Sequence, residues 1–221
     1  MKPHSIILAV AFVFVALGSP PVRAQTGEKP PENKPAESAP AASQPAEVKM
    51  LADFNAPAPS NIGGIFGAFY PETEQIYICQ ETLDDATKHG TTGASMRLVY
   101  NVEKGGSYNG FWMKLGPNDT GNNFDASGYN KLTFWIKGDE SSGIPYKFKV
   151  ELKGDPGTVI GKKYIGDLTD KWTKVEIPLT EFSNQKVDIS KLNEFVVVFE
   201  NRAVAPQTKG AIYIDDVGLE K

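Results

Sequence analysis

The residues best suited to bind another molecule are a tryptophan and several polar side chains that strand alternation places opposite buried neighbours. Trp112 alternates with Phe111 and Met113. An indole ring can cover the apolar face of a sugar ring, while amide, carboxylate and cationic groups nearby can bond to its hydroxyls. The polar candidates obtained from the same alternation are Arg97, Asn101, Lys149 and Glu151. We predict that these side chains line one open sheet face, with Trp112 the better candidate and a plain solvated surface as the alternative for the charged residues.

Residues suited to catalysis are sparse. Once the N-terminal segment with His4 is set aside, His89 is the remaining histidine, and it lies in a Lys88-His89-Gly90 turn. One histidine cannot form a zinc cluster, and a loop residue is a poor base for a serine nucleophile. A carboxylate pair for glycoside hydrolysis stays open, because the spatial separation of the acidic residues is not visible in the sequence. We expect no enzymatic activity, with an uncharacterised hydrolase as the less favoured alternative.

Two adjacent carboxylates interrupt the last apolar run of the chain. Ile212 and Ile214 occupy even positions, whereas Val217 and Leu219 occupy odd ones. A β-bulge at Asp215-Asp216 would restore the register. Burying a carboxylate without a partner is costly, so we expect one of the two to face a cation and the other to reach solvent.

The N-terminal segment has the pattern of a cleavable export signal. Lys2 supplies a positive start, an apolar run covers residues 5–17, and Ala24 ends a small-residue cleavage site. The run of about thirteen residues is shorter than the about 20 that are needed to span a bilayer. We predict that residues 1–24 are a signal peptide and that the protein is secreted or periplasmic.

The remaining chain divides into a linker and one domain. Residues 25–49 are rich in proline and alanine and have almost no large apolar side chain, so they are predicted to be a disordered linker. Residues 50–221 are enough for one domain. Cys79 has no partner for an internal disulfide and is expected to be buried. The net charge of −4 becomes −6 once Lys2 and Arg23 leave with the signal peptide, which disfavours nucleic acid and anionic membranes as partners.

Short alternating stretches separated by Gly, Asn, Asp and Pro dominate the domain and indicate an all-β protein. The clearest stretch covers residues 146–153, where Tyr146 and three other apolar side chains point one way and four charged ones the other. Further strands are expected at residues 50–54, 76–80, 96–102, 111–115, 132–137, 173–177, 195–200 and 211–219. Residues 179–192 are expected to form a loop. Two packed antiparallel sheets are the simplest way to cover the apolar faces, so we predict a β-sandwich.

Several of these segments resemble a known family in their order and spacing. The residues that carry the resemblance are Leu51-Ala52-Asp53-Phe54-Asn55, Asp125-Ala126-Ser127-Gly128-Tyr129, residues 132–138, residues 172–179 with Phe182, and residues 212–217. They resemble the jelly-roll carbohydrate-binding modules of the galactose-binding-like superfamily, most closely family 11, and the domain of complex I intermediate-associated protein 30 has a related pattern. The resemblance implies a two-sheet jelly roll over nearly all of residues 50–221 and non-catalytic glycan binding. It also assigns Trp135 and Trp172 to packing, although strict alternation places Trp135 opposite Phe134 and Ile136.

The resemblance further implies a structural calcium ion between the first strand and the last. The matching positions are Asp53 or Asn55 and Asp215. Oxygen ligands of this kind suit calcium. The alternative is that Asp53 and Asn55 cap turns and that Asp215 forms an ordinary surface hydrogen bond.

Two classes of partner follow from these expectations. The first is a polysaccharide or oligosaccharide bound on one sheet face of a secreted module. The alternative is a protein partner held by the same sandwich, in an interaction or assembly factor. Neither nucleic acid nor membrane is expected as a partner.

Overall fold

The computed structural model describes residues 47–221 apart from residues 59, 71–78, 118–122 and 155–158. These residues belong to one compact unit, Gln44–Lys221. The predicted signal peptide and the predicted linker up to residue 46 lie outside the described residues, as does most of the strand expected at residues 76–80. No helix in the described part of the chain is long and apolar enough to cross a membrane.

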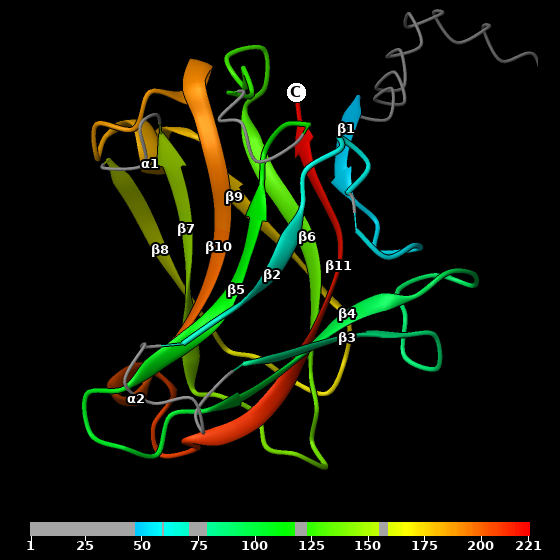
Figure 1. Ribbon diagram of the computed structural model, residues 1–221, viewed down its shortest axis with the longest axis vertical. Coiled ribbons are helices and arrows are strands. Elements are labelled where there is room, and N and C mark those ends of the chain that lie inside the picture. Colours follow the sequence, from blue (N-terminus) through cyan, green and yellow to red (C-terminus); the bar gives the residue numbers. More distant parts are fainter. Residues whose placement is uncertain (1–46, 59, 71–78, 118–122, 155–158) are drawn as a thin grey trace, which may run out of the picture. The chain divides into compact units, whose positions relative to one another are not determined.

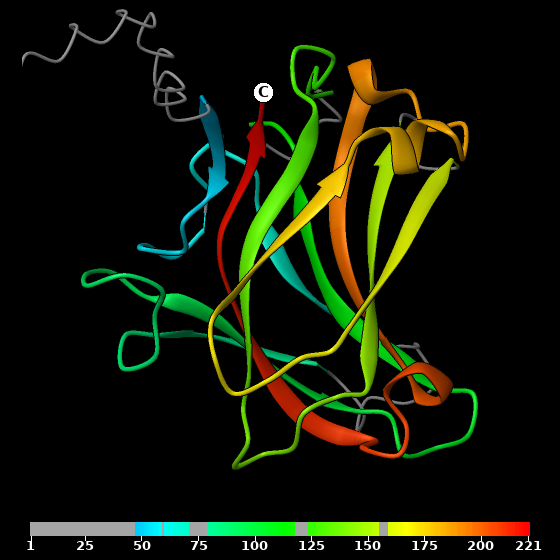
Figure 2. The same ribbon diagram turned by 180° about the vertical axis from the view of Figure 1, so that it is seen from behind.

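The described strands form two antiparallel sheets (Figure 1). Sheet A has the order β3 (Gln80–Asp84), β4 (Ser95–Asn101), β11 (Lys209–Glu220), β6 (Lys131–Gly138) and β9 (Thr173–Pro178), and β1 (Val48–Ala52) also pairs with β11. Sheet B has the order β2 (Phe66–Phe69), β5 (Tyr108–Lys114), β10 (Leu192–Glu200), β7 (Lys147–Gly154) and β8 (Ile160–Gly166). Seen from behind, β9, β6 and β11 of sheet A run side by side (Figure 2).

Aromatic side chains from the two sheets meet in the core. Tyr100 of β4 stacks on Phe199 of β10 with ring centroids 4.5 Å apart, and Phe134 of β6 meets Phe195 of β10 edge to face at 6.2 Å. Each of these four side chains is at most 1% exposed. The contacts join strands of different sheets, which confirms the predicted all-β sandwich of two antiparallel sheets.

The strand boundaries differ from the expectations in several places. Tyr146 precedes β7 and is 65% exposed, so the prediction that it faces the core is wrong. Its N–H bonds to the carbonyl of Val204 rather than to a neighbouring strand. The first strand begins at Val48, inside the predicted linker. Strands β2 and β8 are absent from the expectations, because both contain glycine and neither has a fully buried face.

Short helical segments also depart from the expectations. Residues 179–192, expected to be a loop, contain α1 (Thr180–Ser183) and a 3-10 turn at Ile189–Lys191. A second short helix, α2 (Asn201–Val204), follows β10. Cys79 is buried as predicted, and burial raises the pKa of its thiol.

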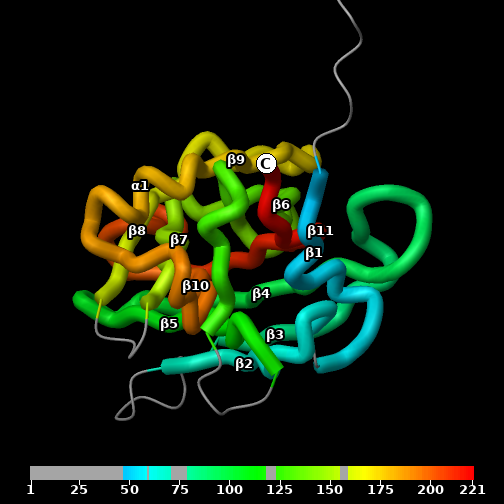
Figure 3. The backbone as a smooth tube through the Cα atoms, turned by 90° about the horizontal axis from the view of Figure 1, so that it is seen from above, coloured from blue at the N-terminus to red at the C-terminus, as the bar shows by residue number. Residues whose placement is uncertain are grey.

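The predicted bulge in the last strand is confirmed. The register of β11 against β6 shifts between Asp215 and Gly218, and Asp216 has a φ of 49°. On its other edge, β11 pairs with β4 through residues 209–214 and with β1 through residues 217–220. Figure 3 shows β1 beside this strand. The two carboxylates therefore lie where β11 exchanges one neighbour for the other.

Candidate functional site

Aromatic rings from two strands, β2 and β5, line one side of the outer face of sheet B. Trp112 of β5 lies opposite Gly67 of β2, and a Cβ atom on this glycine would lie 3.3 Å from the indole. Phe69 pairs with Gly110 in the same way, and a Cβ on that glycine would lie 2.8 Å from the phenyl ring. The two glycines leave room for the rings to lie along the sheet.

The third ring of this side belongs to Tyr108, at the start of β5. It is 47% exposed, and its ring centroid lies 6.4 Å from that of Phe69. An exposed ring next to a packed one offers an apolar surface that is held in place by its neighbour.

Strand β10 supplies the floor of the same face. Its residues Phe195, Val197 and Phe199 belong to the core, so Val196 and Val198 point outward. These two valines are nevertheless only 1% and 5% exposed. Side chains from the neighbouring strands must therefore rise above them and enclose a hollow.

Charged side chains form the side opposite the rings. The Lys149 ammonium group lies 2.7 Å from a Glu200 carboxylate oxygen and 2.9 Å from one of Glu151. The Tyr164 hydroxyl donates to the other oxygen of Glu200 at 2.7 Å. Burial opposes the charge of Lys149, but its hydrogen bonds to Glu200 and Glu151 outweigh burial and raise its pKa. Burial likewise acts to raise the pKa of Glu200, but Lys149 and Tyr164 lower it overall, so both groups are charged at neutral pH.

A second ion cluster closes the far end of the face. Glu194 of β10 lies 2.6 Å from the ammonium group of Lys153 and 3.3 Å from that of Lys114. Lys114 also donates to the side-chain oxygen of Asn193 at 3.2 Å. One carboxylate is thus shared by two lysines from the strands on either side of it.

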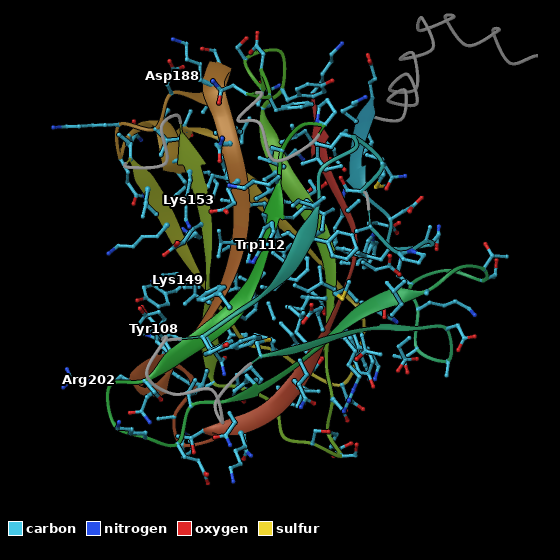
Figure 4. The ribbon with its side chains drawn as sticks, in the orientation of Figure 1. Tyr108, Trp112, Lys149, Lys153, Asp188 and Arg202 are labelled. Atoms are coloured by element: carbon cyan, nitrogen blue, oxygen red, sulfur yellow. The ribbon has the colours of Figure 1, made fainter. Side chains whose placement is uncertain are left out.

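Together these side chains enclose a groove of about 500 Å³. We call it the sheet B groove. Its lining residues are Phe69, Tyr108, Trp112, Lys149, Glu151, Lys153, Ile160, Glu194, Val196, Val198 and Glu200. Figure 4 shows Tyr108, Trp112, Lys149 and Lys153 along this face. The volume falls within the range of ligand-binding pockets, and rings face charged hydrogen-bonding groups across an apolar floor.

The structure brings together three of the five predicted ligand-binding residues. Trp112, Lys149 and Glu151 all line the sheet B groove. Arg97 and Asn101 belong to β4 of sheet A, so the prediction that all five share one face is wrong for these two. Alternation identifies the side of a strand that faces the core, but it does not say to which sheet the strand belongs.

Arg97 and Asn101 have partners of their own within the domain. Arg97 donates to Asp139 at 2.8 Å and to the hydroxyl of Ser142 at 2.9 Å. Burial acts to raise the pKa of Asp139, but hydrogen bonds from Ser141 and Arg97 outweigh burial and hold it well below its usual value. The side-chain oxygen of Asn101 accepts the N–H of Glu103 at 3.3 Å. These contacts fix loops at the end of sheet A.

The outer face of sheet A carries a cluster around His89. The imidazole stacks on Trp135 with centroids 3.8 Å apart and meets Trp172 edge to face at 6.0 Å. Both tryptophans are partly exposed and lie outside the hydrophobic core. The prediction that they pack in the framework is therefore wrong in its location, because they pack against a loop histidine on the outside of the sheet.

The two carboxylates of the bulge hold the same histidine. Asp216 lies 2.8 Å from the Nδ1 atom of His89, and Asp215 accepts the backbone N–H of His89 at 3.0 Å. The Asp215 residue is 3% exposed. Asp216 therefore contacts the imidazole, and a cation at this carboxylate stays a prediction, whereas the expectation that the other carboxylate reaches solvent is wrong for Asp215.

The predicted calcium ligands have separate hydrogen-bond partners. Asp53 accepts the N–H of Asn55 at 3.1 Å and the side-chain amide of Asn61 at 3.0 Å. The side-chain oxygen of Asn55 accepts the N–H of Ala94, and both oxygens of Asp215 accept backbone N–H groups. Among the residues that the structure describes, no group of three or more His, Cys, Asp or Glu side chains could hold a metal ion. These side chains do not form a ready ligand set, and calcium stays a prediction.

Comparison with known proteins identifies the family. The sequence model of the carbohydrate-binding domain of family 11 matches residues 37–190, which is more than half of the chain. The chain therefore belongs to the family 11 carbohydrate-binding domains. No curated protein sequence matches it significantly. The matched residues include four of the five strands that form the sheet B groove; β10 begins after them.

Solved structures agree in fold. The family 11 module of Clostridium thermocellum, solved with a β-1,3-1,4-mixed-linked tetrasaccharide, is 19% identical with a TM-score of 0.56, over 80% of this chain and 96% of that one. The family 30 module of a cellulosomal cellulase of Clostridium thermocellum is 17% identical with a TM-score of 0.54, over 78% and 96%. An exo-β-agarase is 12% identical with a TM-score of 0.55, over 77% of this chain and 24% of that one. At these identities the matches establish the fold, and they confirm the predicted jelly roll.

Ionisation of Asp215 is predicted to destabilise the domain. Burial raises the pKa of Asp215 to about 6, although the N–H of His89 opposes this, from an ordinary value of 3.8. Because the native state holds the proton more tightly than the unfolded state, the stability from this group is greatest at pH below 3.8 and is lost as the pH rises through about 6. Asp215→Asn removes this dependence.

Urea unfolding checks the prediction by comparing His89→Gln with the double variant His89→Gln/Asp215→Asn. In this pair the neighbouring imidazole is absent, and Asp216 is common to both proteins. The free energy of unfolding of the single variant, minus that of the double variant, is expected to fall by about 1 to 2 kcal/mol between about pH 4.5 and 7.5. An equal difference at the two pH values would contradict the assignment.

Proposed function

We propose that the protein is a non-catalytic module that binds a polysaccharide or oligosaccharide chain in the sheet B groove, outside the cytoplasm. The observation that carries the proposal is the pairing of rings with charged groups across the groove. Trp112 and Tyr108 offer flat apolar surfaces, while Lys149 and Glu151 lie on the opposite side. A sugar ring has the same division, with C–H groups on its faces and hydroxyls around its edge.

The ion pairs of the groove hold hydrogen-bond donors and acceptors for sugar hydroxyls in fixed positions without a ligand. Lys149 is held between two carboxylates, so its ammonium group has a fixed position. The carboxylates have accepting lone pairs beyond those used by the lysine. A sugar hydroxyl can donate to Glu151 or Glu200 and accept from Lys149 without a change in the ion cluster, which reduces the ordering cost of binding.

The charge state of the groove supports a role without catalysis. A glycosidase needs a carboxylic acid with a raised pKa as its proton donor. The pKa of Glu200 is instead lowered by Lys149 and Tyr164, and Glu194 binds two lysines. The sole histidine of the described residues, His89, packs on the other sheet. The lowered pKa keeps Glu200 charged, which suits binding and not proton donation.

The family supports a glycan as the ligand. The related module of Clostridium thermocellum was solved with a β-1,3-1,4-mixed-linked tetrasaccharide, so a mixed-linkage β-glucan is a suitable first probe. The leader pattern of residues 1–24 supports export to the compartment in which polysaccharides occur.

Replacement of Trp112 tests the groove directly. Trp112→Ala removes the ring against which the sugar face stacks, and a buried aromatic anchor of this kind is worth about 2 kcal/mol, which corresponds to about a thirty-fold loss of affinity. The measurement is retardation in affinity gels that contain polysaccharides, followed by calorimetry with oligosaccharides.

Trp172→Ala is the matched control, because Trp172 is a partly exposed tryptophan of sheet A, outside the groove. It is expected to keep wild-type affinity once circular dichroism shows that both variants are folded. Equal losses for the two variants, or no retardation of the wild type on any polysaccharide, would contradict the proposal. Co-purification of a protein with the wild type in the latter case would favour the alternative of a protein partner.

The structural calcium ion is a separate proposal that rests on the resemblance of the positions of Asp53, Asn55 and Asp215 and on their oxygen atoms, and binding would require these side chains to leave their present hydrogen-bond partners. A bound ion that prefers the native state stabilises it, so chelation is expected to lower the calorimetric melting temperature and added calcium to restore it. Asp53→Asn is expected to abolish the response. An unchanged melting temperature on chelation rules out the site.

A further inference from the structure

A second cavity adjoins the sheet B groove at the end near α2. Its volume is about 540 Å³, and we call it the α2 cavity. Its lining residues are Gly106, Ser107, Tyr108, Lys147, Tyr164, Glu200, Asn201, Arg202 and Ala203. It shares Tyr108 and Glu200 with the groove, and Figure 4 shows Arg202 and Tyr108 at the same end of the sheet. A linear chain that fills the groove therefore has room to continue into this cavity.

The two cavities differ in how their positive charges are compensated. In the groove, Lys149 and Lys153 each bind a carboxylate. In the α2 cavity, Lys147 and Arg202 form no salt bridge with any residue that the structure describes. The one carboxylate that lines this cavity, Glu200, already binds Lys149 and the hydroxyl of Tyr164. Among the described residues, the two cations of the α2 cavity thus have no carboxylate of their own, whereas the lysines of the groove do.

Aromatic rings lie beside one of these charges, that of Lys147. The Lys147 ammonium group lies 5.2 Å from the ring centroid of Tyr164 and 5.9 Å from that of Tyr146. Such cation–π contacts hold an ammonium group in place while leaving its hydrogen-bond donors available. Tyr108 and Tyr164 are 47% and 42% exposed. The cavity therefore combines exposed rings, which suit a sugar face, with two cations, which suit a carboxylate.

We propose that the α2 cavity binds a uronic acid unit of the chain that occupies the sheet B groove, so that the preferred ligand is an acidic polysaccharide. The sugar carboxylate lies between Lys147 and Arg202, and its ring stacks on Tyr108 or Tyr164. This inference rests on the proposed function, because the groove must first bind the chain. Charge complementarity selects the acidic sugar, since neither cation has a salt-bridge partner in the part of the chain that the structure describes.

The test compares neutral polysaccharides with the same polymers after partial oxidation of their 6-hydroxymethyl groups to carboxylates. Mixed-linkage β-glucan and mannan are the first two pairs, and affinity is measured by calorimetry on fragments of matched length at about 20 mM and about 200 mM NaCl. The oxidised form is expected to bind about five- to thirty-fold more tightly at low salt, as two partly exposed ion pairs allow. The preference is expected to shrink at high salt, because exposed charges are screened.

Lys147→Gln/Arg202→Gln is expected to lower the affinity for the oxidised polymer to that for the neutral one. Lys163→Gln/Lys209→Gln is the matched control, since it removes two positive charges from residues that line neither cavity, and it is expected to retain the preference. Circular dichroism checks the fold of both double variants.

The outcomes separate the inference from the proposed function. Equal affinity of the wild type for the two forms, with binding still sensitive to Trp112→Ala, overturns the acidic ligand and leaves the binding groove in place. A preference that persists in Lys147→Gln/Arg202→Gln overturns the assignment to the α2 cavity. No binding of any polymer overturns both.

Discussion

A strand with apolar side chains on both sides needs cover on both, and β10 imposes this requirement on the domain. Its phenylalanines meet Tyr100 and Phe134 of sheet A, whereas Val196 and Val198 face away from the core and are still almost fully buried. Their cover consists of rings from one side and ion pairs from the other, since β5 and β7 are the neighbours of β10. The same strand therefore fixes the packing of the two sheets and the floor of the groove.

The ion pairs of the groove suit the proposed binding of hydroxyl groups. Lys149 contacts two carboxylates from two strands, and Tyr164 holds one of these from a third. Removal of Lys149 would leave the partly buried carboxylates of Glu151 and Glu200 without the cation that both contact, which is costly. A hydroxyl that enters this network meets donors and acceptors whose positions are already determined, and it adds no net charge. On the proposed function, such a site discriminates by geometry, and its affinity depends mainly on the rings opposite.

The alternation of apolar and polar residues predicts much of the outer face of sheet B. Where this prediction fails, the reason is physical. Alternation places Trp112, Lys149 and Glu151 outward correctly, because each lies between core residues in a regular strand. It does not separate them from Arg97 and Asn101, since membership of a sheet depends on pairings between distant segments. Alternation does not identify Phe69 and Tyr164 as site residues, because their strands β2 and β8 have no clear buried face. For Trp135, alternation indicates the outer face, and the structure agrees with it rather than with the framework assignment.

Gly67 and Gly110, which lie beneath the rings, limit the substitutions that the groove can accept. At residue 110 a Cβ atom would lie 1.9 Å from the carbonyl oxygen of Val197 as well as against Phe69, so any larger residue would displace the backbone of β10. At residue 67 the three atoms nearest to an added Cβ all belong to the indole of Trp112, the closest at 3.3 Å. Ligand preference can therefore change by exchange of the rings at 69 and 112, or by mutation of Gly67 together with Trp112, while residue 110 is closed to variation. Substitutions at 67 and 112 are expected to be epistatic, and a library that varies them one at a time would overlook the viable combinations.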